Sequence, residues 1–167
     1  MLRLILMRHA KSDWSHAGLG DHARPLNKRG RASAKALGYW MRSKEYWPDE
    51  VLCSTAERTG ETLLRLDFNP PLNTRFVSGL YHAEAEEMLG ILHGAQSACV
   101  LMIGHNPGIC EMANRLVEAP PSHERFFDYP TAATLVCDFD KTDWRDVTWF
   151  SGEDVDFVIP RELIAEK

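Results

Sequence analysis

Short apolar runs alternate with longer amphipathic segments along the first two thirds of the chain. Continuous apolar runs are typical of buried strands, and apolar residues three or four positions apart are typical of one helix face. Asn27 stands directly before the longest amphipathic segment, where its side chain is suited to cap a helix. The pattern predicts strands at 2–7, 51–53, 75–77 and 98–103, and helices at 28–44, 56–66, 84–93 and 108–117.

The last third of the chain changes character, because strand-like segments follow one another with little helix between them. We expect strands at 131–139, 144–150 and 155–159, and an antiparallel strand among them. Buried strands that alternate with helices indicate an α/β fold with a mainly parallel sheet. The length of 167 residues suits one domain, which we expect to cover 1–167.

Composition and charge exclude several classes of protein. The net charge of −5 argues against general nucleic-acid binding, because such proteins carry a basic footprint. No apolar run approaches the ~20 residues of a membrane-spanning helix, and no signal peptide is evident. We therefore expect a soluble, cytoplasmic protein that binds neither nucleic acid nor membrane. The four cysteines are widely spaced and fit reduced thiols in or beside the core: Cys53, Cys99, Cys110 and Cys137.

Chemically active residues follow three of the predicted strands. Arg8 and His9 come after the first strand, Arg58 soon after the second, and His105 directly after 98–103. The carboxyl ends of parallel strands meet at one edge of an α/β sheet, where ligands bind. Arginine offers a fork of donors that matches phosphate oxygens, and a neutral imidazole can attack phosphorus. We therefore expect a phosphoryl-transfer site in which a second, protonated histidine stabilises the phosphate oxygens.

Simpler explanations exist for each of these residues taken singly. His9 fits a polar strand end, Arg58 a solvated helix position, and His105 a helix cap. Their occurrence at successive strand ends favours a shared function. The chain has no P-loop, no nucleophile elbow and no H-E-x-x-H motif, and its histidines show no pair with helical ligand spacing, so we expect no metal.

Four motifs occur in a fixed order over roughly residues 1–135: Arg8-His9-Ala10; Asp21-x-x-Arg24-Pro25-Leu26-x-x-x-Gly30; Ser54-x-x-x-Arg58-Thr59-x-x-Thr62; and Gly104-His105-Asn106-Pro107. Together they resemble the histidine phosphatase superfamily, the phosphoglycerate-mutase-like group. The short chain and the L-M-R-H-A-K-S sequence are similar to its SixA-type branch of phosphohistidine phosphatases.

The resemblance implies a fold and a set of roles. The fold would be a three-layer α/β/α sandwich around a mostly parallel sheet, with no metal or organic cofactor. His9 would be the nucleophile that becomes phosphorylated, and Arg8 and Arg58 would clamp the phosphate. His105 would complete the phosphate pocket, and Arg24 would add charge at its rim.

The chain departs from the larger family pattern beside the nucleophile. Position 10 is Ala10 instead of the commoner glycine, and Lys11 stands where the mutases usually have an acidic residue. Lys11 adds positive charge that favours an anionic partner. Ser12 is either a hydroxyl donor to phosphate or a simple turn residue.

The general acid has two candidates. Asp21 matches an aspartate of the short branch and would serve as the acid or orient a neighbour, although a surface pair with Arg24 is the simpler explanation. Glu84 is a candidate by location alone, and it also fits a charge at a helix N-terminus.

The substrate follows from the short chain, which lacks the insertion that covers the site in larger family members. An open site admits a side chain of another protein, and a P–N bond needs a weaker acid than a phosphoester. We therefore expect a phosphatase that acts on phosphohistidine in a protein. The alternatives are a phosphatase of small phosphoesters and, from another class, a binding module for phosphoproteins without turnover.

Overall fold

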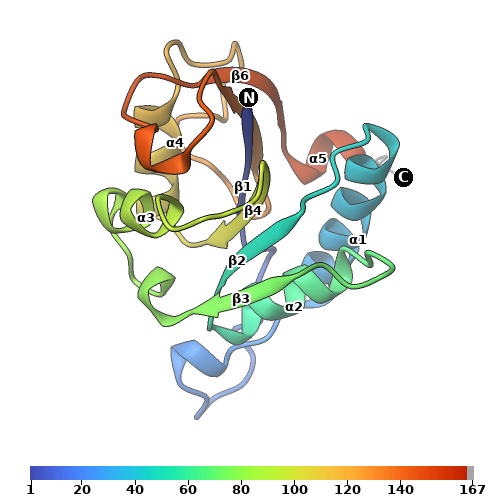
Figure 1. The fold of residues 1–167 in the computed structure, drawn as a ribbon. Helices are drawn as coiled ribbons and strands as arrows, with labels where there is room; N and C mark the ends of the chain where they lie inside the picture. The colour runs from blue at the N-terminus through green and yellow to red at the C-terminus, as the bar shows by residue number, and fades with distance from the viewer. Residues whose placement is uncertain (165–167) are drawn as a thin grey trace.

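The computed structural model describes residues 1–164 and shows a six-stranded sheet with helices on both faces (Figure 1). The strands are β1 (Leu2–Arg8), β2 (Glu50–Ser54), β3 (Thr74–Val77), β4 (Cys99–Gly104), β5 (Thr134–Phe139) and β6 (Glu153–Val158). The helices are α1 (Lys28–Ser43), α2 (Glu57–Arg65), α3 (Ala85–Leu92), α4 (Gly108–Leu116) and α5 (Pro160–Leu163).

The strand order in the sheet is β3-β2-β4-β1-β5-β6. β1 lies in the interior, parallel to β4 on one side and antiparallel to β5 on the other. β2 is parallel to both β3 and β4, and β6 is antiparallel to β5. The predicted α/β fold, with a mostly parallel sheet and an antiparallel strand, is confirmed.

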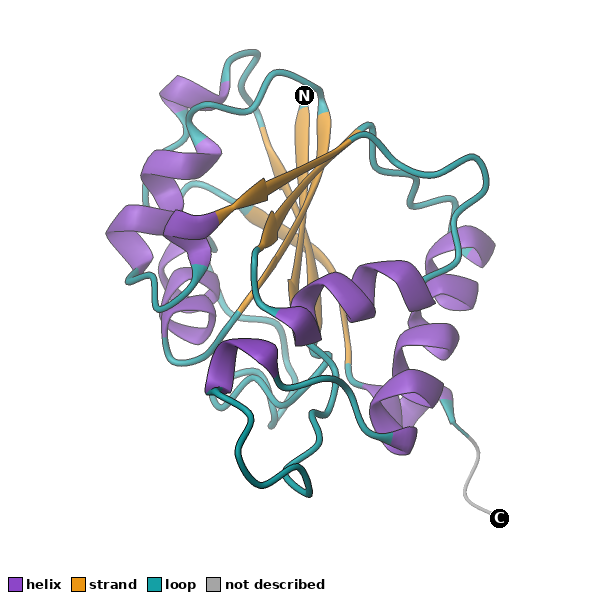
Figure 2. Ribbon diagram, turned by 90° about the horizontal axis from the view of Figure 1, so that it is seen from below, coloured by secondary structure: helices purple, strands orange, loops and turns teal. Residues whose placement is uncertain are grey.

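Side chains of β1 alternate between two hydrophobic cores. Leu4 and Leu6 pack on the face that α3 and α4 cover, and Ile5 and Met7 pack on the face of α1 and α2. All four side chains are fully buried, because this strand has a core on each side of the sheet. Figure 2 shows the strands between the two groups of helices, which is the expected three-layer sandwich.

The helices of the first two thirds begin and end within a residue or two of their predicted limits. Asn27 caps α1 as expected, since its Oδ1 accepts a hydrogen bond from the backbone N–H of Gly30 at 2.8 Å. None of the helices within residues 1–164 is long and apolar enough to cross a membrane. All four cysteines are free; Cys53 and Cys137 are buried, whereas Cys99 and Cys110 are partly exposed.

The predicted strand at 144–150 is wrong. The segment begins with a short 3₁₀ helix, Trp144–Asp146, because the Asp143 carboxylate accepts a hydrogen bond from the backbone N–H of Arg145 at 2.9 Å. The Trp144 indole is buried and donates to a backbone carbonyl in the loop before β4 at 2.6 Å. Apolar residues that looked like one face of a strand therefore anchor a loop.

Two other features of the tail differ from the prediction. β5 begins at Thr134 instead of 131, because a turn precedes it in which the Ala133 N–H donates to the Pro130 carbonyl at 2.9 Å. The short helix α5 after β6 was not expected; it begins at Pro160, whose fixed φ suits the first helical position.

The carboxyl ends of β1, β2 and β4 lie at the same edge of the sheet. Arg8 pairs with Gly104 and Cys53 with Ile103, so the loops that leave these strands start side by side. The loop after β1, blue in Figure 1, passes below this edge and contains the 3₁₀ helix η1 (Asp21–Ala23). The fold thus brings the predicted functional residues to one place.

Candidate active site

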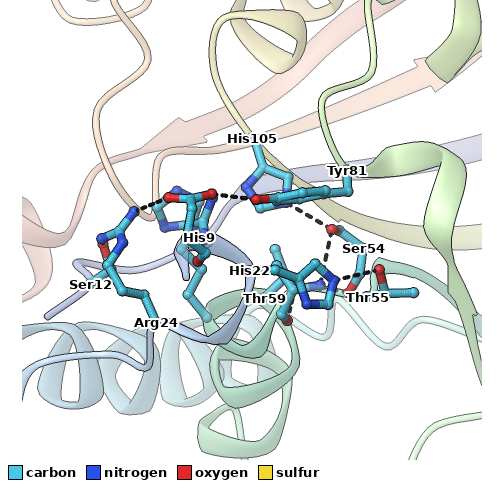
Figure 3. Close-up of polar contacts among 12 residues, drawn as sticks. His9, Ser12, His22, Arg24, Ser54, Thr55, Thr59, Tyr81 and His105 are labelled. Atoms are coloured by element: carbon cyan, nitrogen blue, oxygen red, sulfur yellow. Dashed lines mark hydrogen bonds and ion pairs between the residues drawn. The ribbon is translucent and has the colours of Figure 1, made fainter. Parts of the chain in front are cut away.

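Two histidines, His9 and His105, lie close together at the carboxyl edge of the sheet (Figure 3), and an arginine lies at the same edge. His9 follows β1, Arg58 lies in the first turn of α2, and His105 follows β4. The ring centroids of His9 and His105 are 5.3 Å apart. All three side chains are buried, with exposed fractions of 6% to 8%. Arg8 is half-buried beside them and donates to the Tyr129 carbonyl at 3.2 Å.

The His9 ring is held in one tautomer. Its Nδ1 lies 2.7 Å from the backbone oxygen of Ala10, which can only accept, so Nδ1 carries the hydrogen. Burial, together with the nearby His105, Arg8 and Arg58, lowers the pKa of His9 to about 3, although the hydrogen bond to Ala10 opposes the shift. At neutral pH the ring is therefore uncharged, and Nε2 carries a free lone pair.

Hydrogen bonds hold the loop that contains His9 on three sides. The His9 N–H donates to the Gly104 carbonyl at 3.1 Å, and the His9 carbonyl accepts from the Ala132 N–H at 2.9 Å. The Ala10 N–H donates to the Thr62 hydroxyl at 3.0 Å, and that hydroxyl donates in turn to a carbonyl of α2 at 2.7 Å. The Thr62 position of the third motif thus has a structural role.

Gly30 allows α1 to approach this loop. A Cβ atom at Gly30 would lie 2.0 Å from the carbonyl oxygen of Lys11, which is shorter than any real contact. The Asn27 N–H donates to the same oxygen at 3.0 Å, so the loop cannot move away without losing this bond. The glycine of the second motif is therefore required by packing.

Replacing Gly30 by alanine is expected to destabilise the protein by roughly 2–4 kcal/mol, because the backbone of the His9 loop must shift. Urea unfolding of the variant measures this change. Gly90→Ala is the matched control, since nothing lies within 4 Å of its Cβ position in α3, and it should stabilise the protein by about 0.5–1 kcal/mol. Equal stability of the Gly30 variant and the wild type contradicts the packing argument.

Asp21 links the arginines of the site. Its carboxylate accepts from Arg24 at 2.9 Å, from Arg58 at 3.1 Å and from the Tyr81 hydroxyl at 2.5 Å. The Asp21 carbonyl accepts a further bond from Arg58 at 2.8 Å. The Tyr81 hydroxyl, followed by Arg24, holds the pKa of Asp21 well below its usual range. An ionised carboxylate fits the orienting role better than that of a proton donor at neutral pH.

Arg24 lies at the rim, and both terminal nitrogens of its guanidinium form hydrogen bonds. It donates to the hydroxyl of Ser12, which is buried, and its other nitrogen binds Asp21. The Trp14 ring covers the guanidinium, with 3.5 Å between its centroid and the Arg24 Cζ. Trp14 itself is 78% exposed, so an exposed aromatic ring forms this part of the rim.

Burial and nearby charge favour the neutral form of the His105 ring, whereas we expected this ring to act in its protonated form. Its Nε2 lies 2.7 Å from the Ser54 hydroxyl (Figure 3). Burial, followed by the charge of Arg58, lowers the pKa of His105 to about 4, and Asp21 only partly opposes this effect. Protonation of His105 would require an additional negative charge nearby, such as a phosphate dianion.

We expect the rings of His9 and His105 to stay neutral from pH 8 to pH 5, because their pKa values are lowered to about 3 and about 4. Histidine in an unfolded chain titrates near pH 6.5, so the unfolded state takes up protons first. The stability that these groups contribute is present above about pH 6.5 and is lost as the pH falls toward their folded pKa values. NMR of the ring nitrogens tests this directly, and protonation of either ring between pH 6 and 7 contradicts it.

Several buried polar atoms of the site have no hydrogen-bond partner. Within residues 1–164, the Nε atoms of Arg8, Arg24 and Arg58 and the Nδ1 atom of His105 have no hydrogen-bond partner. Leaving such donors unpaired is costly, and a bound anion would satisfy them. The donor set of three guanidinium groups and an imidazole is suited to phosphate oxygens. In the described part of the chain, no group of three His, Cys, Asp or Glu side chains is placed to hold a metal.

Not every candidate residue joins this cluster. Glu84 is exposed at the N-terminus of α3, where its N–H binds the Glu87 carboxylate at 3.1 Å, so it has the alternative role of a helix-end charge. The Lys11 side chain is exposed and lines a separate groove. Tyr81 was missed, although it follows β3 as the other site residues follow their strands.

Comparison with known proteins identifies the family. The family model of the histidine phosphatase superfamily (branch 1) matches residues 4–80. An uncharacterised protein of Mycobacterium tuberculosis is 36% identical over 109 residues, which are 64% of this chain and 67% of that protein. A chloroplastic protein of Arabidopsis thaliana is 34% identical over 127 residues, 68% of this chain. The match spans 58% of the Arabidopsis protein, so the chain corresponds to little more than half of that relative.

Solved structures agree over nearly the whole chain. A candidate phosphohistidine phosphatase SixA from Nakamurella multipartitia has a TM-score of 0.81 and 28% identity, and the match covers 96% of each chain. Its counterpart from Agrobacterium tumefaciens has a TM-score of 0.78 and 25% identity, and the match covers 95% of this chain and 98% of that one. The chain therefore belongs to the histidine phosphatase superfamily, and its structure is similar over nearly its whole length to those described as SixA.

Proposed function

We propose that this phosphatase removes the phosphoryl group from phosphohistidine in a protein, through a phosphorylated His9. The observation that carries the proposal is the free Nε2 lone pair of His9 among donors that lack acceptors. We also propose that the activity needs no metal and no cofactor, that 1–167 acts as one domain, and that the protein is cytoplasmic.

Binding of the phosphoryl group would use the unpaired donors. Arg58 is oriented by Asp21, and Arg8 approaches from the end of β1, so both can face one set of phosphate oxygens. The negative charge of the phosphate would raise the pKa of His105 from its low value and favour the protonated ring. His105 would then stabilise the charge that develops on the equatorial oxygens.

Transfer would proceed in two displacements. The His9 Nε2 attacks phosphorus, and the bond from phosphorus to the substrate imidazole, whose other ring nitrogen is protonated, breaks. The imidazole takes the electron pair of that bond and leaves as a neutral base. A water molecule then attacks the phosphorylated His9, which releases orthophosphate and restores the neutral ring. Splitting the reaction in this way replaces one difficult step by two easier ones.

The low pKa of Asp21 favours a substrate with a good leaving group. The carboxylate is ionised at neutral pH and bound to two arginines, so it is a poor donor for an alkoxide. In a phosphohistidine whose ring is protonated, the imidazole leaves phosphorus without the help of a strong acid. The rim of exposed Trp14 and half-exposed Tyr81 also suits a side chain presented by a protein. The structural relatives described as SixA add support for this substrate.

The proposal is tested by comparing substrates under identical conditions with excess chelator. We expect phosphate release from a phosphohistidine-containing protein to have a kcat/KM at least about 100-fold above that for small phosphate monoesters. A sugar phosphate that is turned over more efficiently than the phosphoprotein supports the alternative of a small-molecule phosphatase. Phosphoprotein binding without any phosphate release supports a binding module. Loss of activity in chelator contradicts a metal-independent reaction.

A further inference from the structure

A groove of about 560 Å³ lies beside the site, between the start of α1, the segment before β5 and α5. α1 and α5 pack against each other on the same face of the sheet (Figure 1). Four basic residues line the groove: Lys11, Arg29, Arg125 and Arg161. None of the roles proposed above for the phosphate site uses this groove.

The groove is continuous with the loops that position His9. Lys11 follows His9 by two residues and lines the groove. On the opposite wall, Thr131 directly precedes Ala132, whose N–H donates to the His9 carbonyl at 2.9 Å. Pro130 follows Tyr129, whose carbonyl accepts from Arg8. Both walls of the groove therefore belong to the loops that hold His9 and Arg8 in place.

The charge of the groove is opposite to that of the protein. The whole chain has a net charge of −5, yet among the described residues no carboxylate lines the groove. The side chains of Lys11 and Arg29 are exposed and have no ion pair within residues 1–164. Arg125 is paired with Asp128 at 3.0 Å, so its charge is partly compensated. Positive potential concentrated in a concave surface attracts an anionic partner.

We propose that this groove binds an acidic segment of the phosphoprotein substrate, next to its phosphohistidine. The inference rests on the proposed function and adds the surface by which the protein selects its partner. Apolar groups between the cations, from Pro130, Ile159 and Pro160, offer contact to the backbone and stems of such a segment. Charge complementarity of this kind contributes to the rate of association and to the choice of partner.

Two synthetic peptides test the proposal. Each carries one phosphohistidine, flanked in the first by aspartate and glutamate and in the second by asparagine and glutamine. With the wild-type protein we expect kcat/KM to be about tenfold higher for the acidic peptide, with the difference mainly in KM and reduced at high salt. Equal kcat/KM for the two peptides contradicts the proposal.

The groove is tested with a double charge reversal, Arg29→Glu with Arg125→Glu. A glutamate is compatible with position 29 because it lies in the first turn of α1. The matched control is Arg75→Glu with Lys141→Glu, two exposed cations outside the groove, which exchanges the same amount of charge. We expect the groove variant to lose the preference for the acidic peptide and the control to keep it. Equal loss in both variants shows a general charge effect and contradicts the proposal.

A binding measurement separates this inference from the proposed function. Calorimetry with the unphosphorylated acidic peptide needs no turnover, so binding that the groove variant loses supports the groove even if phosphohistidine is not the substrate. A single-stranded oligonucleotide that binds the groove more tightly than the peptide contradicts an acidic protein partner. Thermal unfolding of both double variants confirms that they are folded, and turnover of free phosphohistidine should stay within about twofold of wild type.

Discussion

Replacing His9 by alanine is expected to lower kcat for phosphate release by roughly 10⁴-fold or more and to abolish the phosphorylated enzyme. The physical reason is that the His9 Nε2 holds the free lone pair at the centre of the donors, while Nδ1 is engaged by the Ala10 carbonyl. Burial keeps the ring neutral, so no other imidazole is needed to deprotonate it. Single-turnover assays with a phosphohistidine protein measure the loss.

His105 is the residue best placed to act as the nucleophile when His9 is absent, which would reduce the measured loss, because its ring lies 5.3 Å from that of His9. The measurement therefore includes the double variant of His9 and His105. If the two residues act in one step, the double variant should release phosphate almost as fast as His9→Ala. His16→Ala is the control, since His16 is exposed on the loop after β1. Phosphate release at the wild-type rate by His9→Ala contradicts the mechanism.

Replacing Arg58 by lysine is expected to lower kcat/KM by about 10²–10³-fold, even though the charge is retained. Arg58 is buried, and two of its nitrogens bind the carbonyl and carboxylate of Asp21 at 2.8 and 3.1 Å. Lysine cannot make these bonds and face the phosphate at once, because its charge is a single point without a planar fork. The loss should appear in kcat as well as in KM, since the donors act most strongly on the transition state.

Arg65→Lys in the same helix is the matched control for this substitution. Arg65 is about half exposed and pairs with Glu61 at 3.4 Å, away from the histidines, so the exchange should leave kcat/KM within about twofold. Denaturant unfolding of both variants separates a loss of catalysis from a loss of fold. A change confined to KM in Arg58→Lys shows that the residue contributes only to binding.

Much of the fold was predictable because local pattern and tertiary structure agree in the first two thirds of the chain. The run Leu4–Met7 is apolar on both faces, and only a strand between two helix layers buries both. The side chain of Asn27 caps α1, so this residue indicates in the sequence where the helix begins. The prediction for the tail was wrong where tertiary contacts override the local pattern. Trp144 does not lie in a strand; its indole N–H donates to a backbone carbonyl just before β4 and so anchors a loop.

The sequence predicted which residues form the site, but it predicted their protonation states less well. Successive parallel strands place Arg8, Arg58 and His105 at one edge, and this placement is confirmed. Their catalytic roles stay predictions. The neutral state of His105 depends on burial and on the distance to Arg58, neither of which the residue order contains. The link from Tyr81 to Asp21 joins residues 60 positions apart and had no sequence motif to indicate it.

The most direct test of this account is to trap and locate the phosphorylated enzyme. The protein is mixed with a phosphohistidine protein, quenched in base and analysed by mass spectrometry and ³¹P NMR, which distinguish the two ring nitrogens of histidine. We predict one phosphoryl group on Nε2 of His9, because Nδ1 is held by the Ala10 carbonyl. Phosphate on Nδ1 of His9, on His105 or on any other residue contradicts this mechanism, as does phosphate release without any phosphorylated enzyme under single-turnover conditions.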